Sequence, residues 1–325
     1  MSTVGRIVSP RRASGQPGDR GGDILTGKGD EMLNEESMET IKPVPQRRIA
    51  DKMNEYMSRR DYAGAERHLL YWLAEAELGR DLQGQLMLRN EMVGHYRKTA
   101  QREKAMESAG KALELLAELG MEDSISAGTT YVNIATACNA FGEYERSLEL
   151  FEKARAVYEG SAYVEPRLLG GLYNNMALTC TALSKYDEAL DLYEKAIAVM
   201  AKVQDGELEQ AITCLNMADA VEAGAGMEEG ESRIYELVER AEELLDNKGR
   251  ELLQRPDGEA PGRADDGRSV LEAPGALKSF PAEERARVGY YAFVCEKCAP
   301  VFEYYGYFLT ANKLRETAEK IYAAE

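Results

Sequence analysis

The sequence predicts an all-α protein built from repeated helical hairpins. Residues 131–154 and 173–196 align without a gap and lie 42 residues apart. Apolar residues in both segments recur at i, i+3, i+4 and i+7, which is the spacing of amphipathic helices. Gly142 and Ser184 interrupt the two segments at the same place, which indicates a tight turn between two helices. Because a lone hairpin cannot bury its apolar face, the repeat predicts a stacked α-α solenoid.

Weaker copies of the same pattern extend the array in both directions. One copy begins near Leu86, and an earlier hairpin spans residues 49–78. A later copy starts at Ala211, and we expect a long interhelical turn in it over residues 223–231. About five hairpins therefore occupy residues 46–246, and they should wind into a right-handed superhelix with a concave groove.

Three stretches lie outside these repeats. Residues 1–31 have the composition of a disordered tail. Alternatively, translation begins at Met32, because the residues just before Met32, when reverse-translated, resemble a bacterial ribosome-binding site. Residues 247–281 are rich in Gly and Pro and predict a flexible insert. Residues 282–325 return to a helical pattern, with a new helix expected at Pro300. They should form a C-terminal helical hairpin that caps the solenoid or docks back on it.

Small and aromatic residues recur at matching positions of the two clearest repeats. Ala135 and Ala177 would let paired helices approach closely, and Phe151 and Tyr193 would fill the gap to the next repeat. This arrangement resembles the tetratricopeptide repeat (TPR). The 42-residue period is similar to the longer repeats of kinesin light chains and of bacterial peptide-pheromone receptors. The resemblance implies a bacterial protein that binds a protein or peptide partner.

Charge and cysteine content narrow the partners and the compartment. The formal net charge of -17 disfavours nucleic acid and an anionic membrane surface. No apolar run approaches the length of a membrane-spanning helix, and the N-terminus does not look like a secretory signal. Five cysteines, an odd number, are consistent with reduced thiols. We therefore expect a cytoplasmic protein that binds neither nucleic acid nor membrane.

Asparagines supply the main candidate binding site. The resemblance places Asn133, Asn175 and Asn216 at one position of three successive first helices, facing the concave groove. Since an amide both donates and accepts hydrogen bonds, such a series could hold the backbone of an extended peptide. Alternatively, each asparagine bridges adjacent helices. Asn174 and Arg97 are further candidates for peptide binding, although Arg97 could also lie on a solvated face.

Catalytic and metal-binding motifs are poorly represented. Cys295 and Cys298 form a single Cys-x-x-Cys, whereas a zinc site needs about four ligands. The two histidines, His68 and His95, lie far away in sequence. A redox pair would be expected within a thioredoxin-like βαβ unit, which the helical pattern does not provide. We therefore expect two half-buried helical cysteines, no metal, no cofactor and no enzymatic activity.

The predicted function is a scaffold that holds an extended polypeptide segment in the concave groove. The alternative is a peptide-responsive sensor or regulator related to the bacterial pheromone receptors. Those receptors usually carry an N-terminal effector, and only about 15 ordered residues precede the first hairpin here. A redox or hydrolytic enzyme is the third hypothesis, supported by Cys295 and Cys298 alone.

Overall fold

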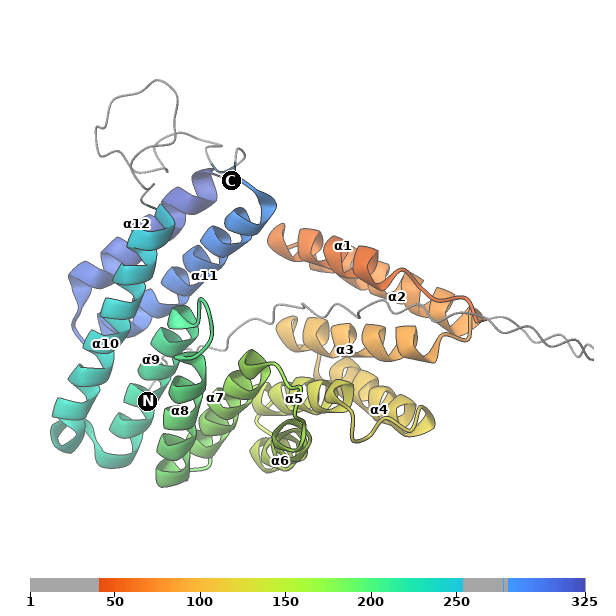
Figure 1. Cartoon of the computed structure of the whole chain (residues 1–325), viewed down its shortest axis with the longest axis horizontal. Coiled ribbons are helices and arrows are strands. Elements are labelled where there is room, and N and C mark those ends of the chain that lie inside the picture. The colour runs from red at the N-terminus through yellow and green to blue at the C-terminus, as the bar shows by residue number, and fades with distance from the viewer. Residues whose placement is uncertain (1–40, 254–276, 278–279, 325) are drawn as a thin grey trace, which may run out of the picture. The chain divides into compact units, whose positions relative to one another are not determined.

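The computed structural model describes residues 41–253, 277 and 280–324. These residues form twelve α-helices and no strand, so the prediction of an all-α fold is confirmed for this part of the chain (Figure 1). They divide into two compact units, one holding the first four helices and the other holding the remaining eight. None of the described helices is long and apolar enough to cross a membrane.

The N-terminal unit consists of two helical hairpins: α1 (Gln46–Ser58), α2 (Tyr62–Leu78), α3 (Leu82–Lys98) and α4 (Arg102–Glu118). Asp61 and Asp81 cap α2 and α3, because their side chains accept hydrogen bonds from backbone N–H groups in the first turn. Asp81 also accepts a bond of 2.9 Å from the N–H of Val44. That bond ties the segment before α1 to the turn between α2 and α3.

The C-terminal unit continues the alternation through four more hairpins: α5 (Ile125–Ala140), α6 (Tyr144–Gly160), α7 (Pro166–Ala182), α8 (Tyr186–Met200), α9 (Glu207–Ala225), α10 (Met227–Leu253), α11 (Ala282–Tyr304) and α12 (Phe308–Ala324). Each helix packs on the next one along the chain from α5 to α12, and α7 also contacts α5 and α9. The first helices of successive hairpins therefore lie beside one another within this unit.

The core of the C-terminal unit combines small and aromatic side chains. Ala135 and Ala177 are fully buried, and so are Phe151 and Tyr193. The small residues let paired helices approach, and the rings fill the space that remains between hairpins. Close approach is also visible at Gly128, where an added Cβ would lie 2.4 Å from the ring of Tyr158.

Each hairpin turn contains a residue with positive φ, and this residue is glycine in some turns and another residue in others. Each tight turn places a residue in the left-handed region, with φ of 79° at Gly142 and 58° at Ser184. Arg60, Arg80 and Ala100 adopt the same conformation in the N-terminal unit. A residue with a Cβ is about 1–2 kcal/mol less stable there than glycine. Helix packing on both sides of each turn evidently outweighs this cost.

Two sequence-based expectations about turns were wrong. The long turn predicted over residues 223–231 is reduced to Gly226, because α9 and α10 extend into it from both sides. The new helix predicted at Pro300 does not form, since α11 continues through that residue to Tyr304. Pro300 is exposed, so water can bind the carbonyl that lacks its helical N–H partner.

The predicted insert also starts too early. Residues 247–253 belong to the last two turns of α10, where Lys248 and Gly249 are buried against neighbouring helices. The remainder of the predicted insert lies almost entirely outside the described residues, as does the predicted tail over residues 1–31.

Candidate functional site

The predicted peptide-binding asparagines lie on the first helices of the C-terminal unit. Asn133 is on α5 and Asn175 is on α7, and both side chains are half-buried. The Asn175 amide has no side-chain hydrogen bond among the residues that the structure describes. The two positions are 42 residues apart on neighbouring helices, as the repeat requires.

Asn174 and Asn216 are arranged differently. Both are buried, with 4% and 6% of their surface exposed, and the Asn216 Nδ2 donates to the Asn174 Oδ1 at 3.2 Å. This bond joins α7 to α9. It corresponds to the alternative in which asparagines bridge adjacent helices, because pairing two buried amides avoids the penalty of leaving them unsatisfied.

Arg97 belongs to the N-terminal unit, near the end of α3. Its side chain is half-buried, and no ion pair to it occurs within the described part of the chain. Burial lowers the pKa of its guanidinium, because desolvation disfavours the charged form. A partly desolvated cation without a counter-ion would gain from an anionic group on a partner.

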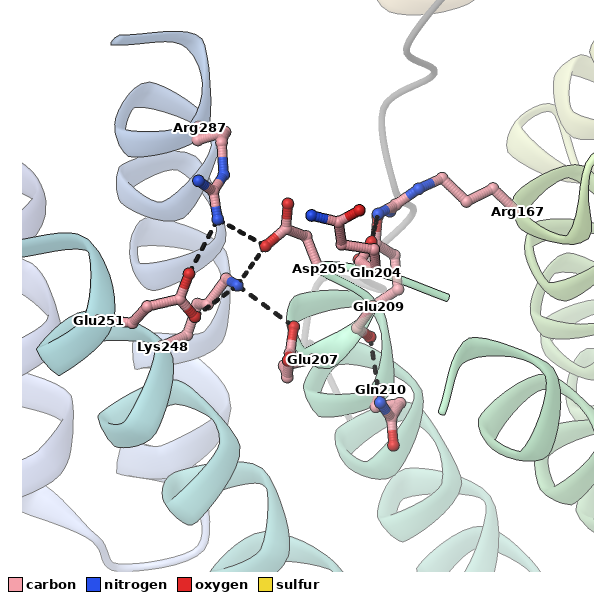
Figure 2. A network of polar contacts seen from close by, with 10 residues as sticks. Arg167, Gln204, Asp205, Glu207, Glu209, Gln210, Lys248, Glu251 and Arg287 are labelled. Atoms are coloured by element: carbon pink, nitrogen blue, oxygen red, sulfur yellow. Dashed lines mark hydrogen bonds and ion pairs between the residues drawn. The ribbon is translucent and has the colours of Figure 1, made fainter. Parts of the chain in front are cut away.

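Sequence reasoning missed a group of charged residues at one end of α10, which Figure 2 shows from close by. Lys248 is only 3% exposed, and its Nζ lies 2.5 Å from Asp205, 2.8 Å from Glu251 and 3.4 Å from Glu207. Arg287, on α11, binds the same Asp205 and Glu251 carboxylates at 2.6 and 2.8 Å. We call these five residues the ionic cluster.

Mutual pairing keeps the ionic cluster charged. Burial by itself would raise the pKa of Asp205, but hydrogen bonds from Lys248 and Arg287 outweigh it and lower that pKa. Burial likewise opposes the charge on Lys248, and hydrogen bonds to Asp205 and Glu251 raise its pKa overall. No local motif marks the cluster, since Lys248 and Arg287 lie 43 and 82 residues from Asp205. Its geometry indicates that it holds α11 against α9 and α10.

A second ion pair next to the cluster extends the polar contacts to α7 (Figure 2). Arg167 lies 2.5 Å from Glu209 at the start of α9, and it also donates to the backbone carbonyl of Gln204 at 2.5 Å. The first turn of α9 is therefore held by Arg167 from the preceding hairpin and by Lys248 from its own partner helix α10.

The cysteine pair does not have the properties of a redox site. Cys295 and Cys298 are fully buried in α11 with free thiols. Burial raises the pKa of Cys295 to about 12 and that of Cys298 well above the ordinary value. Reactive cysteines instead have lowered pKa values and some exposure. The described residues also contain no group of three or more His, Cys, Asp or Glu that could hold a metal ion.

These features define a helical-repeat protein. Family models of the tetratricopeptide repeat match residues 85–160 and 170–203. The chain therefore contains tetratricopeptide repeats, as the sequence predicted. Repeats of this type support a protein-interaction scaffold, because stacked hairpins present extended binding surfaces.

Solved structures are similar to this chain at low sequence identity. BtubC (BKLC) from P. vanneervenii is 19% identical with a TM-score of 0.54, over 69% of this chain and 87% of that one. The apo form of RapI is 16% identical with a TM-score of 0.47, over 86% and 98%. Nearly identical TPR-like repeats, named for a kinesin light chain of Podosopora anserina, are 18% identical with a TM-score of 0.41, over 72% and 93%. A comparison with curated proteins finds no match.

Proposed function

We propose that the protein binds an extended polypeptide segment across the first helices α5 and α7, and that Asn133 and Asn175 hold the peptide backbone. The observation that carries the proposal is the placement of two half-buried amides at matching positions of neighbouring repeats. Each amide can donate to a peptide carbonyl and accept from a peptide N–H. Recognition of this kind depends little on the side chains of the ligand.

The spacing of packed helices suits an extended ligand. Neighbouring helix axes lie about 8–10 Å apart, and an extended chain advances about 3.3 Å per residue. Successive asparagines would therefore meet the peptide backbone about every third residue. The bond between Asn174 and Asn216 holds α7 and α9 together beside this surface, so these two residues act by fixing the spacing. We keep Arg97 as a separate candidate contact within the N-terminal unit, for an acidic group of a partner.

The first experiment captures partners from a lysate of the source cell on the full chain, with quantitative mass spectrometry. A second bait carries Asn133→Ala and Asn175→Ala, and a control bait carries Asn54→Ala and Asn312→Ala, two exposed asparagines elsewhere. Circular dichroism checks that all baits are equally helical. We expect the partner to be lost from the double variant alone.

The second experiment tests backbone recognition with a synthetic peptide from the captured partner. At about 0.5 kcal/mol for each of the four hydrogen bonds, losing both amides should weaken binding roughly 30-fold in calorimetry. N-methylation of the peptide backbone should weaken binding too, whereas alanine replacement of its side chains should matter less. Equal binding by the double variant and the control would refute the proposal.

The same peptide distinguishes the scaffold from the alternative of a peptide-responsive sensor. A scaffold should show slower hydrogen exchange mainly in α5 and α7 when the peptide binds. A sensor should change exchange across distant hairpins as well, because its two states differ globally. We expect the local result.

A further inference from the structure

The first hairpin carries an open hollow of about 560 Å³ between α1 and α2. Its α2 side is aromatic, made by His68, Tyr71 and Trp72, with Trp72 at 5.2 Å from Tyr71 and 6.3 Å from His68, centre to centre. Tyr71 is 58% exposed, and Leu78, two helical turns further along α2, is 82% exposed. We call Tyr71, Trp72 and Leu78 the aromatic stripe. Large apolar side chains left open to water in a stripe of this kind indicate an interaction surface.

One polar atom in the hollow also lacks a partner. The Nε2 of His68 is buried and makes no hydrogen bond within the described part of the chain. Burial lowers the pKa of His68, so the ring is neutral at neutral pH. Buried polar atoms normally have a hydrogen-bond partner. The unpaired Nε2 of His68 is therefore a second indication that another molecule covers this surface.

The α1 side of the hollow carries charges in a pattern that is complementary to itself. Arg48, Asp51, Lys52 and Glu55 line it at i, i+3, i+4 and i+7, so all four share one helix face. Their signs alternate as positive, negative, positive, negative. Arg48 and Asp51 are exposed and have no ion-pair partner among the described residues.

A second copy of the chain fits this pattern through two-fold symmetry. An axis passing between Asp51 and Lys52 lays α1 antiparallel on α1 of the second copy. Arg48 then faces Glu55 of the second copy, and Asp51 faces Lys52 of the second copy. The symmetry repeats both pairings, as in any interface that uses the same patch on both subunits.

The local charge balance of the first hairpin is compatible with a second copy. Repulsion disfavours contact between two chains of formal charge -17. The first hairpin is an exception, since residues 46–78 hold six basic and six acidic side chains. It is therefore a part of the surface that two copies can bring together without like-charge repulsion.

We propose that the protein forms a two-fold homodimer through this face of α1 and α2. Arg48 and Asp51 pair across the axis with Glu55 and Lys52 of the second copy, which already pair with each other within their own chain at 2.6 Å. Tyr71, Trp72 and Leu78 become buried on either side of the axis. Charge pairing sets the register, whereas burial of the aromatic stripe supplies most of the affinity.

Light scattering and sedimentation of the full chain across a wide range of concentrations test the proposal. Trp72 is the single tryptophan, so its emission reports on the hollow. We expect a dimer and a shift of the emission to shorter wavelength as it forms. Arg48→Glu should weaken the dimer at least about tenfold, because the axis repeats each like-charge contact.

Charge exchange and a matched control complete the design. Arg48→Glu combined with Glu55→Arg should restore the dimer, which a fold defect could not do. Tyr71→Asp should give a monomer, whereas Tyr163→Asp, at an exposed tyrosine between α6 and α7, should leave the dimer intact. Circular dichroism checks the helicity of each variant. A wild-type chain that stays monomeric overturns the proposal, whatever other molecule enters the hollow. A dimer unaffected by Arg48→Glu and Tyr71→Asp overturns it as well.

Discussion

Replacement of Lys248 with methionine should destabilise the C-terminal unit by about 2 kcal/mol. Lys248 is 3% exposed and is bound to three carboxylates, so its removal leaves them without their central cation. Breaking a fully buried pair in this way costs about 3–5 kcal/mol. The cost is lower here because Asp205, Glu207 and Glu251 are 26%, 39% and 50% exposed. Arg287 also continues to neutralise Asp205 and Glu251.

A matched control separates the effect of burial from the loss of an ion pair. Lys111 lies 2.8 Å from Glu114 at i,i+3, the same distance and spacing as Lys248 to Glu251. Lys111 is 51% exposed, however, and exposed pairs contribute about 0–1 kcal/mol. Lys111→Met should therefore change stability far less than Lys248→Met.

Native-state hydrogen exchange is the appropriate assay, because repeat proteins open locally and unfold in parts. Peptides from α9, α10 and α11 should exchange faster in Lys248→Met, since the ionic cluster joins these helices. Peptides from α5 and α6 should change little. If both lysine variants changed exchange equally, or if neither did, burial of the ionic cluster would not be the source of its stability.

Three further predictions concern packing and titration. Gly128→Ala should cost about 1–3 kcal/mol in urea unfolding, because its Cβ would overlap Tyr158; Gly171→Ala, with open space around it, should not destabilise. Acidification below the ordinary histidine pKa of 6.5 should destabilise the N-terminal unit, because burial lowers the pKa of His95 and the unfolded chain takes up the proton first. His95→Gln should reduce this dependence between pH 7 and 5, with the remainder due to His68, whose pKa burial also lowers; an unchanged slope would contradict the assignment. The Cys295 thiol, its pKa raised by burial to about 12, should resist alkylation until the protein is unfolded; rapid labelling of the native protein would count against a buried, inert thiol.

Periodic features of the fold were predictable from the sequence. The 42-residue repeat, the apolar spacing and the matched small residues Ala135 and Ala177 indicated stacked helical hairpins. These features act over one or two helical turns, so neighbouring residues suffice to reveal them. Local rules failed where packing overrode them: α11 runs through Pro300, and the helices flanking Gly226 absorb the predicted turn.

The roles of single polar side chains depended on contacts between distant residues. Asn175 and Asn216 looked equivalent in the sequence, yet Asn216 is paired with Asn174 and buried, while Asn175 is partly open. Lys248 looked like the start of a flexible insert, yet it is the centre of the ionic cluster.

The sequence by itself therefore determined the class of protein and the helical repeat, because both follow from short-range periodicity. Only the tertiary structure decided which amides and charges are satisfied internally and which remain available to a partner. The physical reason is that satisfaction of a polar group depends on atoms brought near it by packing, such as Asp205 and Arg287, which lie 82 residues apart.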